Sequence, residues 1–278
     1  MTQLETAPTT YLPVRSLPIV KATDLGSVQV LKHGNRFLLT DSFGDIHPDS
    51  RGLGLYEGDT RILACSVLRV GGVRPVLLQT SVGANYRGGI QMTNPSADRN
   101  PDAKVHPTHK LVGRTIGISR DRLIGADGVS ERLRIVNHAA EPASVAVDLE
   151  LGADGADIFE VRGYPRKGRG QLLPVAATDR RVTFRYVGLD KVELMTHLAF
   201  SEPAEAVEPV TEALPDGSDV GAAIRLRWTL TMGPGEVREL TWTTWSSERP
   251  APDDAPVEPT SSADQAALFP PIPRVSPD

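Results

Sequence analysis

Apolar and polar residues alternate with a period of two along much of this chain. The clearest case is the stretch 222–231, AAIRLRWTLT, in which the apolar side chains from Ile224 to Leu230 fall on one face and the arginines and threonines on the other. Such alternation predicts an antiparallel strand with one buried face. Comparable runs predict further strands at 27–32, 35–41, 62–70, 73–80, 111–120, 131–138, 143–151, 181–188, 191–200 and 236–245.

Glycine-containing turns separate several of these runs. His33-Gly34 lies between the first two, and Gly71-Gly72 lies between the runs 62–70 and 73–80. A two-residue Gly-Gly connection favours a β-hairpin, because its turn requires positive φ angles. About a dozen such strands, with no amphipathic helices between them, predict an all-β fold: a large antiparallel β-sandwich (a supersandwich) with long loops.

The composition distinguishes the predicted sandwich from the two ends of the chain. The 278 residues include 25 glycines and 23 prolines, an excess that favours turns over long helices. Eight of the prolines lie in 246–278, which also carries most of the net charge of −5. Proline at this density blocks helices and sheet ladders. We therefore expect a flexible segment at 1–26, a sandwich domain at 27–245 and a proline-rich acidic linker or tail at 246–278.

Charge, hydropathy and cysteine content exclude several classes of function. The negative net charge disfavours binding to nucleic acid or to an anionic membrane. No apolar run approaches the ~18 residues of a membrane-spanning helix, and Cys65 is the only cysteine, so no internal disulfide forms. The N-terminus has no signal-peptide pattern, so a cytoplasmic protein is expected. Gly52 and Gly54 lack the spacing of a nucleotide-binding loop, and we expect no cofactor.

Asp59 and Arg61 are the first candidate binding residues. In an extended segment their side chains point to the same side, because they lie two residues apart. The carboxylate accepts hydrogen bonds while the guanidinium donates them, so the pair suits the vicinal hydroxyls of a sugar. The same residues could instead form an internal ion pair that pins a long loop. The residues alone favour this second interpretation.

The stretch 81–110 predicts a long, polar, turn-rich loop, a type of segment that often carries function. Tyr86 and Arg87 could stack on or clamp a sugar there. His106 and His109 are three residues apart, but a proline lies between them and no third ligand is close. We therefore expect no metal site in this loop.

The stretch 151–170 combines acidic and basic residues. Asp154, Asp157 and Glu160 are accompanied by the basic residues of the segment 162–169. Paired carboxylates are what glycoside hydrolysis requires, one as acid and one as base or nucleophile. Neighbouring cations favour ionised carboxylates, however, which opposes a general acid. A structural ion-pair network at a sheet edge is the favoured interpretation, and we expect no catalytic residue here.

Five motifs occur in an order that resembles a known family. They are GDI (44–46), GLYEGDTR (54–61), TNP (93–95), ERLRIVN (131–137) and ADGADIFEVRG (153–163), followed by RKGRG (166–170). Together they are similar to the N-terminal domain of bacterial and archaeal glycogen debranching enzymes of the amylo-α-1,6-glucosidase type. The sequence departs from the family at Gly155, where an aromatic residue is common.

The resemblance implies a β-sandwich that precedes a helical (α/α)6 domain, and in the family the catalytic carboxylates lie in that helical domain. The sequence shows no such helical region, so we expect a non-catalytic accessory domain of an α-glucan debranching glycosidase. It would pack on a helical glycosidase domain or subunit. The residues expected on the functional or interface surface are Asp59, Arg61, Asn94, Asp157, Glu160 and Arg162.

Two alternatives stay open. A stand-alone carbohydrate-binding module would need an exposed aromatic platform, whereas Trp228, Trp242 and Trp245 lie in predicted strands, where packing in the core is the default. A small sugar-modifying enzyme, such as an epimerase, would need a histidine or a pair of carboxylates in a cleft. A docking domain, in contrast, predicts a large exposed apolar patch.

Overall fold

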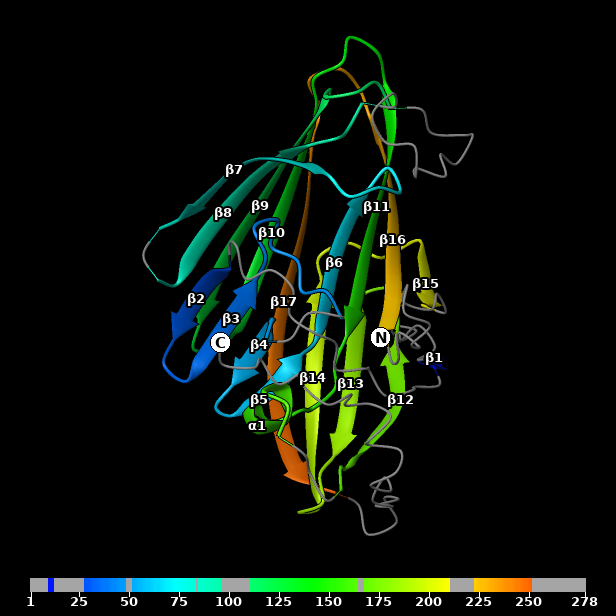
Figure 1. The fold of residues 1–278 in the computed structure, drawn as a ribbon. Coiled ribbons are helices and arrows are strands. Elements are labelled where there is room, and N and C mark those ends of the chain that lie inside the picture. Colours follow the sequence, from blue (N-terminus) through cyan, green and yellow to red (C-terminus); the bar gives the residue numbers. More distant parts are fainter. Residues whose placement is uncertain are drawn as a thin grey trace, which may run out of the picture.

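Three antiparallel sheets contain all the strands in the described part of the computed structural model (Figure 1). The structure describes residues 10–12, 28–48, 52–83, 85–96, 111–164, 168–210 and 223–251. The largest sheet has nine strands, in the spatial order β1 (Thr10–Leu12), β12 (Gln171–Ala177), β13 (Arg181–Val187), β14 (Val192–Phe200), β17 (Val237–Pro250), β10 (Gly128–Asn137), β9 (Ile116–Gly125), β8 (Arg87–Thr93) and β7 (Val76–Val82).

Each of the other two sheets has four strands. One has the order β15 (Ala206–Pro209), β16 (Ala223–Met232), β11 (Ala143–Gly152) and β6 (Cys65–Val70). The other has the order β2 (Gln29–His33), β3 (Arg36–Thr40), β4 (Gly54–Glu57) and β5 (Thr60–Leu63). The described residues contain one helix, α1 (Ile158–Val161), which follows β11.

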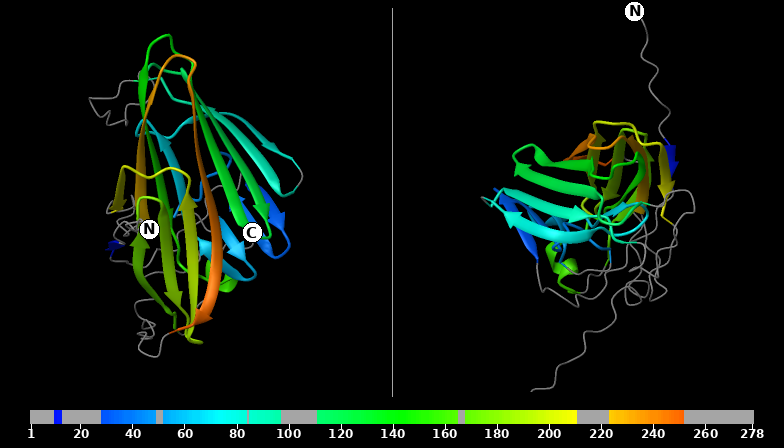
Figure 2. Two further views of the ribbon diagram at one scale, coloured as in Figure 1. Left: turned by 180° about the vertical axis from the view of Figure 1, so that it is seen from behind. Right: turned by 90° about the horizontal axis from the view of Figure 1, so that it is seen from above.

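Both four-stranded sheets lie against the same face of the nine-stranded sheet (Figures 1 and 2). Leu133 of β10, Leu149 of β11 and Leu226 of β16 belong to one hydrophobic cluster between these layers, and none is more than 1% exposed. Burial of this apolar face is the main stabilising contribution to such a fold. The predicted all-β sandwich is confirmed.

The period-two pattern of β16 is also confirmed. Ile224, Leu226 and Trp228 are buried, while the arginines between them are only partly buried. Trp242 of β17 is also in the core. Trp245 is not: it is half-buried and stacks on His197 of β14, with 5.2 Å between ring centroids.

The predicted hairpin at Gly71-Gly72 is wrong, although the turn itself is present. Both glycines have positive φ, at 66° and 79°, and Val70 N donates to Val73 O at 2.9 Å. The flanking strands do not pair with each other: β6 pairs with β11, and β7 pairs with β8. The turn therefore leads the chain from a four-stranded sheet to the nine-stranded one.

The predicted loop 81–110 is wrong at its beginning, because β8 lies within it. Gly88 and Gly89 resemble turn residues, yet they sit inside this strand and pair with both β7 and β9. A Cβ at Gly88 would lie 3.4 Å from Leu31 Cδ2, so the glycine lets β2 pack closely over the sheet. His106 and His109 lie outside the described residues.

Two predicted boundaries also need correction. Thr10–Leu12, expected to be flexible, pair with β12 as strand β1. The tail was predicted to begin at 246, but β17 continues to Pro250, and Ser246 pairs with Thr196 of β14. The polar residues after Trp245 are accommodated because the end of this strand is half-buried or exposed. The other residues of the two predicted terminal segments, apart from Ala251, lie outside the described part.

The helix content of the described residues also bears on membrane association. No helix in this part of the chain has the length and apolar character that a membrane span requires.

Candidate functional site

Charged residues from separate motifs meet inside the sandwich. The first such group, which we name the inner network, consists of Asp45, Arg120, Arg122 and Glu131. Arg120 donates from Nη1 to Asp45 Oδ1 at 2.8 Å and from Nε to Glu131 Oε2 at 2.9 Å. Arg122 Nε donates to the same Glu131 oxygen at 2.8 Å. Arg120 is 0% exposed, so the network joins the segment after β3 to strands β9 and β10 within the core.

Strand register explains how the inner network forms. Glu131 of β10 stands directly opposite Arg122 of β9, and Arg120 is the next inward-facing residue of β9. Side chains paired in this way across strands are neighbours on one face of a sheet. Burial acts to raise the pKa of Glu131, but the charges of Arg122 and Arg120 outweigh it and lower the pKa from 4.5 to about 2.

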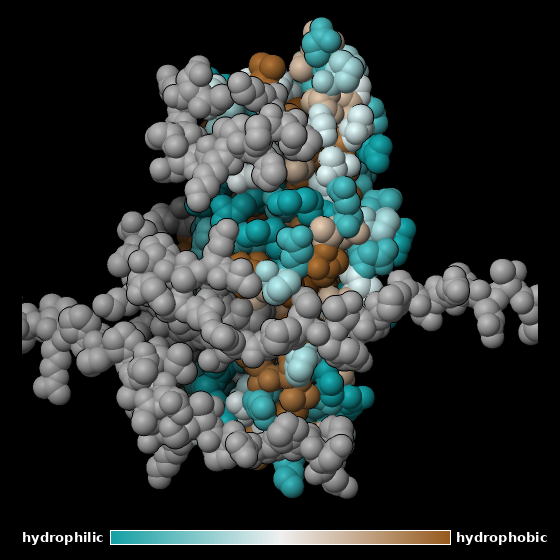
Figure 3. All heavy atoms as spheres, turned by 90° about the vertical axis from the view of Figure 1, so that its right-hand side faces the viewer, coloured by the Kyte–Doolittle hydropathy of each residue, from teal (hydrophilic) through white to brown (hydrophobic). Residues whose placement is uncertain are grey.

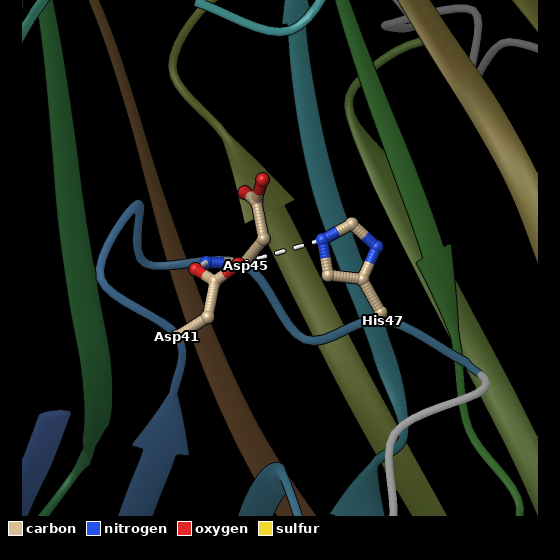
Figure 4. Close-up of side chains that lie close together, drawn as sticks. All are labelled: Asp41, Asp45 and His47. Atoms are coloured by element: carbon tan, nitrogen blue, oxygen red, sulfur yellow. Dashed lines mark hydrogen bonds and ion pairs between the residues drawn. The ribbon is translucent and has the colours of Figure 1, made fainter. Parts of the chain in front are cut away.

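The inner network continues toward the surface through the loop after β3. Asp41 accepts hydrogen bonds from the backbone N of Phe43 at 2.9 Å and of Asp45 at 2.8 Å, which fixes the loop. Arg74 forms ion pairs with Asp41 and, at 3.5 Å, with Asp45, while its guanidinium lies 3.8 Å above the Phe43 ring. His47 Nε2 lies 3.5 Å from Asp41 Oδ2, and His47 comes from the other end of the same loop (Figure 4).

Asp41, Asp45 and His47 have ligand atoms within 4.8 Å of one another, the arrangement of a possible cation site. The two carboxylates, however, already balance the guanidinium groups of Arg74 and Arg120. A divalent cation would have to displace a buried arginine that is fully paired. The donor set therefore fits a structural ion network better than a metal centre.

The pKa shifts in this loop favour the charged forms of Asp41 and His47, but not of Asp45. Burial acts to raise the pKa of Asp41, but the hydrogen bond with His47 and the Arg74 charge prevail and lower it to about 2. Burial acts to lower the pKa of His47, yet Asp41 and Asp45 together raise it above its ordinary value. For Asp45, burial is the dominant effect and raises the pKa.

The second group, which we name the outer network, joins three further motif segments. Its members are Arg61 of β5 and, from the segment after β11, Asp154, Glu160 and Arg169. Arg61 Nε donates to Asp154 Oδ1 at 3.2 Å, and Arg61 Nη2 bonds to the other carboxylate oxygen. Arg169 Nη2 donates to Asp154 O at 2.7 Å, and Arg169 Nε lies 2.9 Å from Glu160 Oε1. The favoured interpretation of 151–170, an ion-pair network, is thus confirmed.

The two carboxylates of the outer network have opposite pKa shifts. Burial acts to raise both; Arg61 outweighs burial at Asp154 and lowers its pKa, whereas burial prevails at Glu160 and raises it. Opposed shifts resemble an acid and base pair. Asp154 is nevertheless 0% exposed and Glu160 only 4%, and both are bound by arginine. Neither oxygen pair is accessible to a glycosidic bond.

A capping box starts α1, the helix that carries Glu160 of the outer network. Asp157 Oδ1 accepts from Phe159 N at 2.7 Å and from Glu160 N at 3.0 Å, while Glu160 Oε2 accepts from Asp157 N at 3.1 Å. Ile158 N also donates to Asp59 O at 2.8 Å. These bonds satisfy amides that a helix start otherwise leaves without partners. They fix a short helix that propensity alone would not hold.

The predicted site residues separate into buried and exposed ones. Arg61 pairs with Asp154, so the interpretation of Asp59 and Arg61 as an ion pair with each other is wrong, although Arg61 does form an internal ion pair. Asn94 is 2% exposed, donates to Val112 O at 2.7 Å and accepts from Ile116 N at 2.9 Å. Asp157 and Glu160 serve the capping box.

Two of the six predicted site residues, Asp59 and Arg162, are exposed. Both lie beside α1: Asp59 through its carbonyl, and Arg162 as the residue that ends the helix. No contact described here tests whether either one binds a ligand or a partner, so their functional role stays a prediction.

Gly155 lies against an aromatic ring from another strand. Its φ is +60°, and a Cβ there would lie 2.5 Å from Tyr186 Cγ of β13. The Tyr186 hydroxyl accepts from Gly170 N at 2.9 Å, and the Arg169 guanidinium lies 5.8 Å from the ring centre. The ring of β13 thus occupies the space that a side chain at position 155 would need.

The residues alone did not indicate two features. One is the inner network. Its signal in the sequence is that Arg120, Arg122 and Glu131 occupy inward positions of β9 and β10, where the alternating pattern predicts apolar residues. The other is an exposed aromatic pair beside α1, Phe159 and Tyr164. Their ring centroids are 5.9 Å apart at an interplanar angle of 78°, and the residues are 52% and 60% exposed.

Comparisons with solved structures find distant likenesses. One is the Slr1438 protein of Synechocystis sp. PCC 6803, 8% identical, with a TM-score of 0.48 over 84% of this chain and 99% of that chain. A protein of Escherichia coli K12, provisionally assigned as an aldose 1-epimerase, is 11% identical with a TM-score of 0.45 over 80% and 99% of the two chains. A provisionally assigned kojibiose phosphorylase from the human microbiome is 9% identical, with a TM-score of 0.45 over 91% of this chain but 32% of that one.

Comparison with known sequences gives a more specific result. No curated protein matches the sequence. The family described as the N-terminal domain of (some) glycogen debranching enzymes matches residues 31–243. This range contains every residue of the inner and outer networks. It also contains α1 and its exposed aromatic pair. The chain therefore belongs to the family of N-terminal domains of glycogen debranching enzymes.

Proposed function

We propose that this protein is a non-catalytic accessory domain of an α-glucan (glycogen) debranching system in the cytoplasm. In this role it packs on a helical glycosidase domain or subunit, which supplies an amylo-α-1,6-glucosidase activity. The observation that carries the proposal is the use of the motif charges: Asp45, Glu131, Asp154 and Glu160 are all buried and paired with arginine. They stabilise the sandwich instead of facing a substrate.

The chemistry of glycoside hydrolysis supports a non-catalytic role. Hydrolysis needs two carboxyl groups on either side of the glycosidic bond, one of them protonated before reaction. The acidic pair of the outer network is enclosed, and breaking either of its ion pairs would leave an unpaired buried charge. A carboxylate that holds the fold together in this way is poorly suited to exchange protons with a sugar.

The described surface offers places for a partner. Val76 and Leu78 on the edge strand β7 and Tyr86 in the next turn are each at least 40% exposed. An exposed apolar edge strand is a common site of association. The side of the molecule seen in Figure 3 has no comparable continuous apolar strip in its coloured part: its hydrophobic residues form small areas among hydrophilic ones. Asp59 and Arg162, the exposed residues of the predicted interface, lie beside α1 instead.

One alternative has an observation in its favour. A stand-alone carbohydrate-binding module needs an exposed aromatic platform, and Phe159 with Tyr164 provides two exposed rings. A small sugar-modifying enzyme has less support. Among the described residues its best match is Asp41, Asp45 and His47, whose carboxylates are already paired with arginine.

Reconstitution tests the proposal directly. The chain and a separately expressed helical glycosidase domain from the same genome are mixed, and glucose release from a branched limit dextrin is measured for each alone and for the mixture. We expect no release by the chain alone, a stoichiometric complex in size-exclusion chromatography, and a higher rate or longer enzyme lifetime in the mixture. Glucose release by the chain alone, or no complex and no change in the mixture, would contradict the proposal.

A further inference from the structure

Phe159 and Tyr164 form an exposed aromatic pair beside α1. The rings contact each other edge to face, 5.9 Å apart at 78°, yet each residue remains more than half exposed. Large aromatic side chains are usually buried in a core, as Trp228 and Trp242 are here. A pair of exposed rings in contact is therefore a feature of the surface that suggests a ligand.

The backbone beneath these rings is held firmly. Tyr164 N donates to Phe159 O at 2.9 Å, and Gly163 N donates to Glu160 O at 2.8 Å, which fixes the turn between them. The capping box at Asp157 holds the start of α1, and the outer network holds its buried side. A surface ordered before binding loses little conformational entropy when a ligand arrives.

Polar groups accompany the rings. Arg162 lies between Phe159 and Tyr164 in the sequence and is exposed; its N donates to Ile158 O at 3.1 Å. Asp59 is also exposed, and its carbonyl is bonded to the residue that precedes Phe159. An exposed arginine and an exposed aspartate thus adjoin, through their backbones, the helix that carries Phe159.

We propose that Asp59, Phe159, Arg162 and Tyr164, which we name the α1 platform, bind a glucose unit of an α-glucan chain. The apolar C–H face of a pyranose ring packs on an aromatic ring, while its hydroxyl groups accept from Arg162 and donate to Asp59. This inference rests on the proposed function, which supplies the α-glucan. It assigns to the sandwich a direct contact with the substrate polymer.

The size of the α1 platform favours a sugar over a protein. A specific protein interface buries about 800 Å² on each partner. An aromatic side chain buries about 150–250 Å² when fully covered, and these two are already partly covered. The two rings thus supply much less apolar area than a protein partner needs, but enough for one or two sugar units.

Affinity electrophoresis in native gels that contain glycogen tests the α1 platform. The variants are Phe159→Ala/Tyr164→Ala, Tyr164→Phe, which keeps the ring, and Val237→Ala as the control. Val237 is 39% exposed and begins β17, away from α1 in the fold (Figure 1). We expect glycogen to retard the native protein, Tyr164→Phe and Val237→Ala alike. The double variant should bind about tenfold more weakly or worse, as loss of about 1.4 kcal/mol implies, and maltoheptaose should release the native protein.

Thermal unfolding of each variant is measured in parallel, and unchanged midpoints are expected because the replaced side chains are largely exposed. Absence of retardation of the native protein, or equal retardation of the double variant, would overturn the inference. The same variants are tested for the complex with the helical domain. If the double variant loses that complex while glycogen binding is unchanged, the rings serve a protein contact and the accessory role stands without the sugar site.

Discussion

Arg61 and Asp154 form a buried ion pair across 93 positions of the sequence, with Arg61 Nε 3.2 Å from Asp154 Oδ1. The pair joins β5 of a four-stranded sheet to the segment that follows β11 and leads into α1. Their side chains are 5% and 0% exposed, so the pair is shielded from solvent. Removing one partner from such a pair costs much more than removing both.

Asp154→Ala is therefore expected to lower the free energy of unfolding by about 3–5 kcal/mol, because it leaves the Arg61 charge buried without its partner. Urea denaturation followed by circular dichroism measures the loss. The control is Asp59→Ala at an exposed neighbouring position, which should change stability by less than about 0.5 kcal/mol. Arg61→Met/Asp154→Leu should recover part of the loss. Equal stability of the Asp154→Ala and Asp59→Ala variants would contradict the structural role.

Glu131→Gln should change how stability depends on pH. The native-state pKa of Glu131 is lowered to about 2, below its ordinary value of 4.5. A lowered pKa stabilises the fold above the unfolded-state value, and this stabilisation is lost as pH falls from about 4.5 toward 2. The native protein should exceed the variant in stability at pH 7, and the difference should shrink progressively below pH 4.5.

Chemical denaturation at several pH values between 7 and 3 measures this difference. Glu239→Gln serves as the control, because the Glu239 side chain is 47% exposed and its ion pair with Arg134 is long, at 3.8 Å. Its variant should follow the native protein over the whole range. A constant difference between native protein and Glu131→Gln below pH 4.5 would show that the carboxylate charge does not matter in the inner network.

Gly155→Ala should destabilise the protein more than Gly58→Ala. Both glycines have positive φ, +60° and +57°, so each substitution carries a similar backbone penalty of about 1 kcal/mol. A Cβ at position 155 would also meet Tyr186 at 2.5 Å, whereas nothing lies within 4 Å at position 58. Differential scanning calorimetry of the two variants isolates the contact with Tyr186. Equal midpoints would indicate that the tyrosine moves aside without cost.

Asp157→Ala should loosen α1. The substitution removes the side-chain acceptor for two helix amides, a loss that typically costs about 0.5–2 kcal/mol, whereas Asp157→Ser keeps a hydroxyl acceptor and should cost less. Amide hydrogen exchange of residues 158–164 measures local opening. We expect faster exchange in the alanine variant and near-native exchange in the serine variant. Native protection in both would mean that packing alone holds the helix.

The strands were predictable because their information is local. In β16 every second residue is apolar, and this pattern is enough to place Ile224 and Trp228 in the core without knowledge of the partners. The turn at Gly71-Gly72 was local as well. The sheet to which the next strand belongs could not be predicted locally, because the same turn can connect two paired strands or lead the chain from one sheet to another.

The sequence predicted that an ion-pair network would form at 151–170, but it did not predict the partners, which are distant in the sequence. The sequence places acids near arginines in 151–170, but the partner of Asp154 comes from β5. Arg120 reaches Asp45 across 75 positions. The exposed position of Phe159 and Tyr164 follows from a helix of one turn, which leaves no periodic signal in the sequence.

Strand β17 has a mechanical consequence for whatever follows it. Its first half is paired with β10 and its second half with β14, so the chain leaves the sheet at Pro250 beside β14. A pull on the following segment acts along the strand and loads these hydrogen bonds in parallel, instead of opening them one at a time. Resistance to forced unfolding is governed by the rate of unfolding rather than by equilibrium stability. A body tethered beyond Pro250 would thus be attached to a strand that is paired along its whole length, Val237–Pro250, within the nine-stranded sheet.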